Sequence, residues 1–309
     1  MKKLLLILSF TVIGLGISAQ QDAMFTHYMF NTIAVNPAYA GSRDAFTITG
    51  LHRSQWVGFE GAPITQTLTM HTPIPLKNSG IGLSFVNDKI GPMRTTSFYV
   101  DYSYTIQIGK KSHLAFGFKA GANMLKGDLT SLSLTDPNDP AYISDTQSEF
   151  LPNFGFGLYY NTDNYYAGIS VPKLLENDFK NNSVSGSTDL GGEEKHYFLI
   201  AGSIFNIGQQ FKIKPTTFVK VTNAAPIEAD ITATLIYKDK VWLGGMFRTG
   251  DAAGMLMGIN ITDVLAVSYS FDFSYTNSTF KYNQGSHEIM LRYDLVLKNE
   301  KKIYSPRYF

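Results

Sequence analysis

The sequence predicts an all-β fold: a transmembrane antiparallel β-barrel of about fourteen strands that follows a cleaved signal peptide. Three observations support this prediction. Apolar and polar residues alternate along most of the chain, and several of the alternating segments are about ten residues long. In addition, every second connection between these segments is short, and the long connections all fall among the others.

One segment, LAVSYSFDFSY at residues 265–275, shows the alternation clearly. Every second side chain is apolar or aromatic, and the positions between them carry Ala, Ser and Asp272. Neighbouring residues of a strand point to opposite faces of the sheet, so this strand has one apolar and one polar face. We expect the apolar face to contact lipid and Asp272 to face the barrel interior.

The same pattern recurs from one end of the mature chain to the other. A soluble sandwich would have to bury all of these apolar faces between two sheets, whereas a closed barrel gives them to lipid and leaves no unpaired edge. The other expected strands lie near residues 45–56, 62–73, 79–88, 97–108, 113–124, 151–161, 164–171, 196–206, 212–221, 227–237, 240–248, 254–262 and 288–297.

The connections between the expected strands give an independent test, because outer-membrane barrels have short periplasmic turns and longer surface loops. With both termini in the periplasm, the two long connections, residues 125–150 and 172–195, fall together on the outer side, with a moderate one at 276–285. The expected periplasmic turns are all short: residues 74–78, 109–111, 162–163, 207–209, 238–239 and 263.

The two ends of the chain differ from the expected barrel. Lys2 and Lys3 precede a short apolar run that ends in small residues, which is typical of a secretory signal peptide. The residues after it are apolar without alternation, and either pack below the barrel or enter the lumen as a plug. The expected division is a signal peptide at 1–19, a periplasmic or plug-like segment at 20–44, the outer-membrane barrel at 45–297 and a periplasmic tail at 298–309.

Composition excludes several classes of function. The balance of 26 Lys and Arg against 25 Asp and Glu gives no basic field for nucleic acid. The absence of cysteine removes disulfides and thiolate metal sites. The six histidines have no metal-ligand spacing, and no G-x-S-x-G motif occurs. We therefore expect no enzymatic activity, no metal and no cofactor.

Three parts of the chain supply candidate partner-binding residues. The loop TDPNDPAYISD is acidic, but it lacks the glycine and the closing glutamate of a calcium-binding EF-hand loop. The stretch RSQWVGFEGAP is expected to form a hairpin tip with two aromatic residues at the outer interface. The third part is the apolar N-terminal segment. The candidates are Asp136, Asn138, Asp139, Tyr142 and Asp145, then Trp56 and Phe59, then Phe25, Tyr28 and Phe30.

Several stretches together resemble the PorP/SprF family of type IX secretion system outer-membrane proteins from the Bacteroidetes. The resemblance covers nearly the whole mature chain. It is carried by YMFNTIAVNPAYAGS, RSQWVGFEGAPITQTL, GIGLSFVNDKIGP, PNFGFGLYY, YYAGISVPKLL, KVWLGGMFRTGDAAGMLMG, GSHEIMLRYDL and SPRYF.

The resemblance implies a non-enzymatic outer-membrane barrel that serves protein secretion and gliding motility. Such a barrel is expected to contact periplasmic ring or peptidoglycan-binding proteins of the secretion machinery, or to export and anchor a surface adhesin through its C-terminal sorting domain. The alternative from a different class is a passive channel for small solutes. An open lumen would distinguish the channel, and the mixed charges expected inside the barrel argue against it.

Overall fold

The structure is a computed structural model that describes residues 24–43, 45–75, 78–132, 145–146, 148–181, 188–223, 225–275 and 282–295. The expected signal peptide and C-terminal tail lie outside the described residues.

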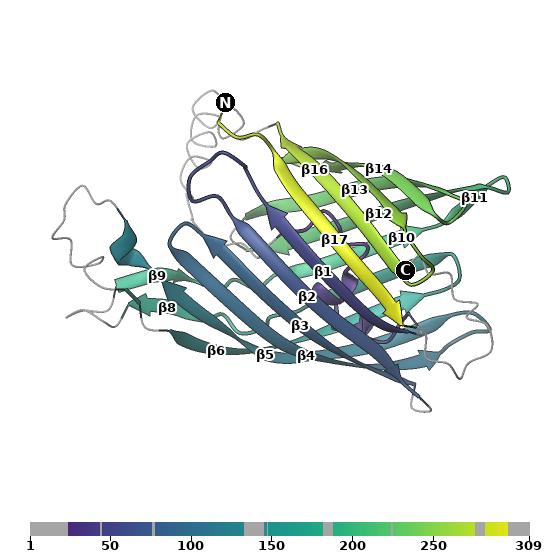
Figure 1. Cartoon of the computed structure of the whole chain (residues 1–309). Helices are drawn as coiled ribbons and strands as arrows, with labels where there is room; N and C mark the ends of the chain where they lie inside the picture. The colour runs from purple at the N-terminus through teal and green to yellow at the C-terminus, as the bar shows by residue number, and fades with distance from the viewer. Residues whose placement is uncertain are drawn as a thin grey trace, which may run out of the picture.

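The structure confirms an antiparallel barrel of fourteen strands (Figure 1). Short strand β11 continues the course of β10 after Ile204 and pairs with β12, so the two count as one wall strand. The wall strands are β1 (Phe46–Ser54), β2 (Ile64–Ile74), β3 (Ser79–Ile90), β4 (Met93–Gln107), β5 (His113–Gly127), β6 (Glu149–Asn161), β7 (Tyr165–Val171), β10 (Tyr197–Ser203) with β11 (Phe205–Ile207), β12 (Phe211–Thr222), β13 (Ala225–Tyr237), β14 (Val241–Arg248), β15 (Ala252–Asn260), β16 (Leu265–Ser274) and β17 (Ser286–Leu295).

Each wall strand pairs with the next one along the chain, and one further pairing, between the first and the last strand, closes the ring. Strand β1 pairs with β17, and β10 pairs with β12. Closure leaves no strand edge whose backbone groups would lack partners in hydrocarbon. A separate hairpin, β8 (Asp178–Asn181) with β9 (Thr188–Gly192), lies within the connection from β7 to β10, where the sequence predicted only a loop.

The connections divide the barrel into two ends that we name by their length. The short-turn end carries residues 75–78, 108–112, 162–164, 208–210, 238–240 and 261–264. The long-loop end carries the connections at 55–63, 128–148, 172–196 and 275–285, together with tight turns at 91–92, 223–224 and 249–251. The long connections therefore lie on one side, as predicted.

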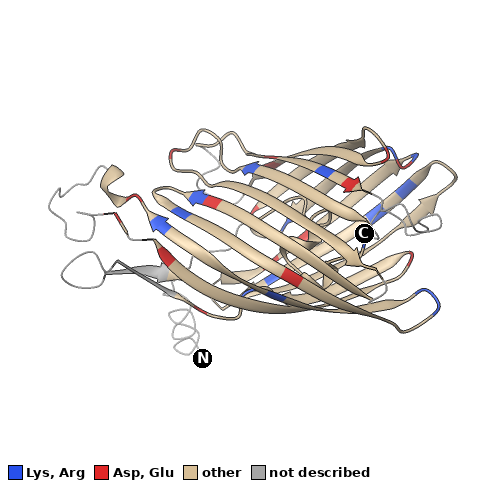
Figure 2. Cartoon of the chain, turned by 60° about the horizontal axis from the view of Figure 1, so that its bottom comes forward, with Lys and Arg blue, Asp and Glu red and all other residues tan. Residues whose placement is uncertain are grey.

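Alternation separates an apolar outer face from a polar inner face. In β14, Trp242, Met246 and Arg248 are buried, whereas Val241, Leu243 and Phe247 at the alternate positions are exposed. Large exposed hydrophobic residues of this kind occur on strands all around the barrel, far beyond the apolar patch of an ordinary soluble protein. Figure 2 shows that charged residues are sparse on the strands. The outer face is therefore suited to lipid.

Residues 24–43, which we call the inner segment, lie inside the barrel (purple in Figure 1). They form two short 3-10 helices, η1 (Thr32–Ala34) and η2 (Pro37–Tyr39), and a third, η3 (Leu129–Ser131), follows β5. Asn36 Oδ1 accepts a hydrogen bond from Ala38 N, and Pro37 begins η2, which produces the predicted turn. No helix in the described part of the chain is long and apolar enough to cross a membrane.

The inner segment packs directly against the barrel wall at positions that have no side chain. A Cβ atom added to Gly117 of β5 would lie 2.0 Å from Ala38 N, and one added to Gly80 of β3 would lie 2.2 Å from Ala40 O. Backbone atoms cannot move aside as a flexible side chain can. Glycine at these positions therefore allows the close approach of the inner segment.

We expect Gly117→Val to destabilise the folded barrel by about 1–3 kcal/mol, because the valine overpacks against the backbone of η2. The matched control is Gly245→Val in β14, where an added Cβ meets no atom within 4 Å. The midpoint of heat denaturation, followed by the change in gel mobility of the folded barrel, measures the effect. Equal midpoints for the two variants would contradict the close packing.

Candidate functional site

The inner segment crosses the lumen from the long-loop end to the short-turn end. Met24 lies near the long-loop end, where Lys220 Nζ is 3.2 Å from its sulfur. Gly41 lies at the short-turn end, against Pro73 and Gly80, and its N–H donates to His71 Nδ1 at 3.1 Å. The segment therefore occupies the lumen along its whole described course.

Strands on all sides of the barrel hold the inner segment by hydrogen bonds. The bonds come from polar inward side chains or backbone carbonyls of the wall. They link Asn31 to Thr69 of β2, Ala40 to Ser103 of β4, Asn36 to Leu158 of β6, Val35 to Ser170 of β7, and Tyr28 to Thr216 of β12 and Thr232 of β13. A segment bound on every side fills the lumen rather than lining one wall.

A buried ion network fixes the long-loop half of the inner segment. Arg53 of β1 lies 2.7 Å from Asp272 of β16 and 3.1 Å from Glu288 of β17. Thr26 Oγ1 donates to Asp272 at 2.5 Å, and the backbone N–H groups of Thr26 and His27 donate to Glu288 at 2.9 and 2.8 Å. All five residues are at most 2% exposed. Asp272 thus faces the interior, as its place in the alternation predicted.

His27 joins Ser268 and Glu288 in the order found in a serine hydrolase, an arrangement that the sequence did not reveal. His27 Nε2 lies 2.7 Å from Ser268 Oγ, and His27 Nδ1 lies 2.6 Å from Glu288. However, the Ser268 hydroxyl donates its one proton to the carbonyl of Met257 at 2.7 Å. While the Ser268 hydroxyl donates to Met257, its proton is not shared with His27, so this arrangement does not activate the hydroxyl as a nucleophile. The three side chains are also buried.

Several other charges inside the barrel are paired with opposite charges. Arg248 makes two hydrogen bonds of 2.8 Å to the carboxylate of Asp230, and Lys119 lies 3.2 Å from Asp101. Asp294 lies 3.2 Å from both Arg43 and Arg292. The predicted mixed-sign interior is present. Because the charges neutralise one another, the lumen does not offer a path lined by one sign of charge.

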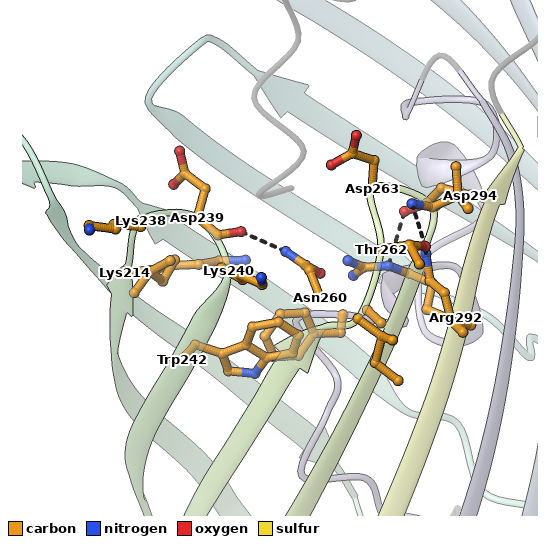
Figure 3. A pocket seen from close by; sticks show the side chains of 16 residues that line it. Lys214, Lys238, Asp239, Lys240, Trp242, Asn260, Thr262, Asp263, Arg292 and Asp294 are labelled. Atoms are coloured by element: carbon orange, nitrogen blue, oxygen red, sulfur yellow. Dashed lines mark hydrogen bonds and ion pairs between the residues drawn. The ribbon is translucent and has the colours of Figure 1, made fainter.

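A cavity of about 570 Å³ opens at the short-turn end (Figure 3). It lies between the inner segment, represented by Phe30, and the strands and turns from β12 to β17. The basic side chains that line it are Lys214, Lys238, Lys240 and Arg292, and Trp242 adds an aromatic wall. Lys214 Nζ lies 5.1 Å from the centre of the Phe30 ring. Asp239, Asp263 and Asp294 also line it, so the cavity combines cationic, acidic and aromatic groups.

At the long-loop end, hydrogen bonds tie the bases of the loops to the wall. Glu193, before β10, accepts from the side-chain amides of Asn123 on β5, Asn153 on β6 and Asn177 in the same connection. Thr146 Oγ1 accepts from Gly127 N at the end of β5. Both long connections therefore start and finish at fixed positions.

The predicted partner-binding residues fall in three different environments. Asp136, Asn138, Asp139 and Tyr142 lie outside the described residues. Asp145 accepts hydrogen bonds from the backbone and side chain of Thr130, which lower the pKa of its carboxyl. In the part of the chain that is described, no group of three or more acidic or histidine side chains could hold a metal ion.

The aromatic candidates are divided between the surface and the lumen. Phe59 is 44% exposed in the connection from β1 to β2, and Trp56 beside it adopts a positive φ of 45°, which is uncommon for a bulky residue. Phe25 and Tyr28 are buried inside the barrel, and Phe30 is half-buried at the cavity. A partner could therefore reach Phe25 and Tyr28 only if the inner segment moved.

Comparisons with known proteins agree with the fold. A family model described as type IX secretion system membrane protein PorP/SprF matches residues 17–293. The Ralstonia pickettii toluene transporter TbuX has a TM-score of 0.50 at 8% identity, over 88% of this chain and 94% of that one. The Acinetobacter baumannii outer membrane protein Omp33 has a TM-score of 0.45 at 11% identity, over 82% and 99%. At 8% identity the likeness to TbuX concerns the fold alone. No curated protein matched the sequence.

We expect Arg53→Met to destabilise the folded barrel by about 3–5 kcal/mol, because it leaves the buried carboxylates of Asp272 and Glu288 without their shared cation. The control is Lys111→Met, which removes a solvent-exposed ion pair with Asp163 and should change little. Denaturant titrations of both variants measure the difference. An Arg53 variant as stable as the control would show that the network does not hold the structure together.

Proposed function

Because the chain belongs to the PorP/SprF family of type IX secretion system membrane proteins, we propose that it is a non-enzymatic platform in the outer membrane. It supports the export and surface attachment of a cargo adhesin at one end and contacts the secretion machinery at the other, with a role in gliding motility. The observation that carries this proposal is the filled lumen. A barrel occupied by its own chain is suited to contact rather than to passage.

In the proposed orientation the long-loop end faces outward and the short-turn end faces the periplasm, as in other outer-membrane barrels. Strand β17 ends with Leu295 at the short-turn end, so the chain leaves the barrel toward the periplasm. The described chain starts with Met24 near the long-loop end. The described residues therefore support a periplasmic position for the C-terminal end of the chain. The periplasmic position of the N-terminus stays an expectation.

The long-loop end is the proposed cargo surface. Phe59 and Trp56 lie there beside the connection that precedes β17, since Val57 N donates to Gly285 O and Gln284 N donates to Val57 O. The candidates Asp136, Asn138, Asp139, Tyr142 and Asp145 belong to the connection from β5 to β6 at the same end. Fixed loop bases limit the freedom that cargo binding would have to remove.

The short-turn end is the proposed surface for periplasmic ring or peptidoglycan-binding proteins. Its turns carry Lys110, Lys111, Lys238 and Lys240, and the cavity opens between the last two and β16. Asp163, Asp239 and Asp263 lie on the same turns, and Asp163 pairs with Lys111. The four lysines still outnumber these three carboxylates, so this end suits a partner with an excess of acidic side chains, because complementary charges speed encounter and favour the correct orientation.

Replacing residues 133–143 by a short Gly-Ser linker should spare barrel assembly, since Thr146 keeps its contact with Gly127 at the end of β5 and Asp145 keeps its contact with Thr130 of η3. We expect recovery of the large surface protein with the tagged barrel to fall about tenfold, which corresponds to about 1.4 kcal/mol. Recovery of periplasmic machinery should stay unchanged. Quantitative mass spectrometry after gentle detergent extraction measures both.

The control for this experiment is the double variant Lys110→Gln and Lys111→Gln at the opposite end. For this variant, recovery of periplasmic machinery should fall and recovery of the surface protein should stay unchanged. Unchanged cargo recovery in the loop variant would refute the cargo role of this loop. Recovery of the barrel alone from wild-type cells would refute the platform.

A further inference from the structure

The outer face of the barrel carries charge at one place only among the described strands. Side chains alternate along the wall strands, with one register shift between β12 and β13, so the outward positions of every strand can be assigned. Within the fourteen described wall strands, Lys, Arg, Asp and Glu occur at three outward positions: Lys89 of β3, Arg94 of β4 and Lys126 of β5. Figure 2 shows basic residues side by side on neighbouring strands at one end of the barrel.

These three residues, which we call the cation row, stand in direct cross-strand register. Lys89 pairs with Arg94, and Arg94 pairs with Lys126. Adjacent strands are about 4.8 Å apart, so three positive charges lie within roughly 10 Å of one another along the rim. Like charges directly opposite on a sheet repel and destabilise it. An anion bound to such a row would offset the repulsion.

The described protein supplies only part of that negative charge. Lys126 Nζ lies 2.8 Å from Asp128 Oδ1, but both side chains are about half exposed, so water screens the pair. Among the described residues, the structure gives no ion pair for Lys89 or Arg94. The nearest acidic strand residue, Asp88, points inward and accepts a hydrogen bond from Thr65 at 2.6 Å. Asp145 also acts on the charge of Lys126. The three cations of the row outnumber the carboxylates of Asp128 and Asp145, so the row keeps a net positive charge.

Below the cation row, the outer face continues with an amide and hydroxyl row and then with hydrocarbon. Gln66, Asn87 and Thr96 stand side by side on β2, β3 and β4, and Asn87 hydrogen-bonds to both neighbours at 3.4 Å. The next outward positions on the same strands are Leu68, Phe85 and Phe98, all strongly exposed. Successive rows are about 6.8 Å apart along a strand.

We propose that the cation row and the amide row bind the headgroup of a phosphorylated glycolipid in the outer leaflet of the membrane. Phosphate contacts Lys89, Arg94 and Lys126, and the amide-bearing sugar contacts Gln66, Asn87 and Thr96. The acyl chains then lie along Leu68, Phe85 and Phe98. The order of chemical groups along the strands matches the order in such a lipid, from charged headgroup to hydrocarbon.

The position of the row favours a lipid over a soluble anion or a protein. The row lies on the lipid-facing side of the wall, directly above an apolar band, and lysine and arginine at such rims reach the headgroup layer. Arginine in addition pairs with phosphate through two parallel hydrogen bonds. The inference rests on the proposed orientation, since the long-loop end must face the outer leaflet.

Native mass spectrometry of the delipidated, detergent-purified barrel, titrated with diphosphoryl lipid A, tests the proposal. We expect one tightly bound lipid per barrel, and at least about tenfold weaker binding when Lys89, Arg94 and Lys126 are all changed to Gln. The matched control changes Lys110, Lys111 and Lys238 at the short-turn end to Gln, and should bind as wild type does. Equal binding by the two triple variants would overturn the site.

A parallel titration with phosphatidylglycerol tests the kind of lipid. Equal affinity for both lipids would overturn the assignment to a glycolipid, because it would show that negative charge alone is recognised. Preference for lipid A that disappears after Asn87→Leu would support the role of the amide row. Far-ultraviolet circular dichroism of each variant confirms that a loss of binding does not come from misfolding.

The orientation is tested separately, because the chain contains no native cysteine. In intact cells, a membrane-impermeant maleimide should label Glu60→Cys at the long-loop end and leave Lys110→Cys unlabelled. The reverse pattern would overturn both the outer-leaflet assignment and the proposed orientation. The expected labelling together with absent lipid A binding would overturn the lipid site alone and leave the proposed function in place.

Discussion

The constraint on which the rest of the structure depends is that a chain in hydrocarbon must pair its own backbone N–H and C=O groups. Pairing of β1 with β17 and of β10 with β12 satisfies it by closing the sheet. Closure makes every strand two-sided, with one face toward lipid and one toward the lumen. It also creates an interior too wide for the inward side chains of the strands to fill alone. The inner segment fills this space, and the glycines facing it provide the necessary room.

The buried charges follow from the same constraint. An ionised side chain on the lipid face of a barrel costs desolvation free energy. Nearly all charged side chains of the strands therefore point inward and must pair there. Arg53 joins β1, β16 and β17 to the inner segment in this way. A buried ion pair contributes little net stability compared with apolar packing, whereas breaking one is costly. We infer that these pairs fix where the inner segment lies more than how stable the barrel is.

The sequence was sufficient to predict the barrel, because alternation is a local signal that each strand repeats. It placed Asp272 in the interior and both long connections at one end. The path of the inner segment could not be predicted, since it has no period and its partners are far away: His27 and Ser268 are 241 residues apart. The β8–β9 hairpin lacked a clear alternating pattern. Lys89, Arg94 and Lys126 form a row only once the strand register is known.

The central claim is that the inner segment closes the lumen, and single-channel recording in planar bilayers tests it most directly. The account predicts no steady open level for the wild-type barrel, with a variant lacking residues 24–40 as the open reference. A steady, ohmic conductance of the wild type similar to that reference would contradict the account and favour a passive channel.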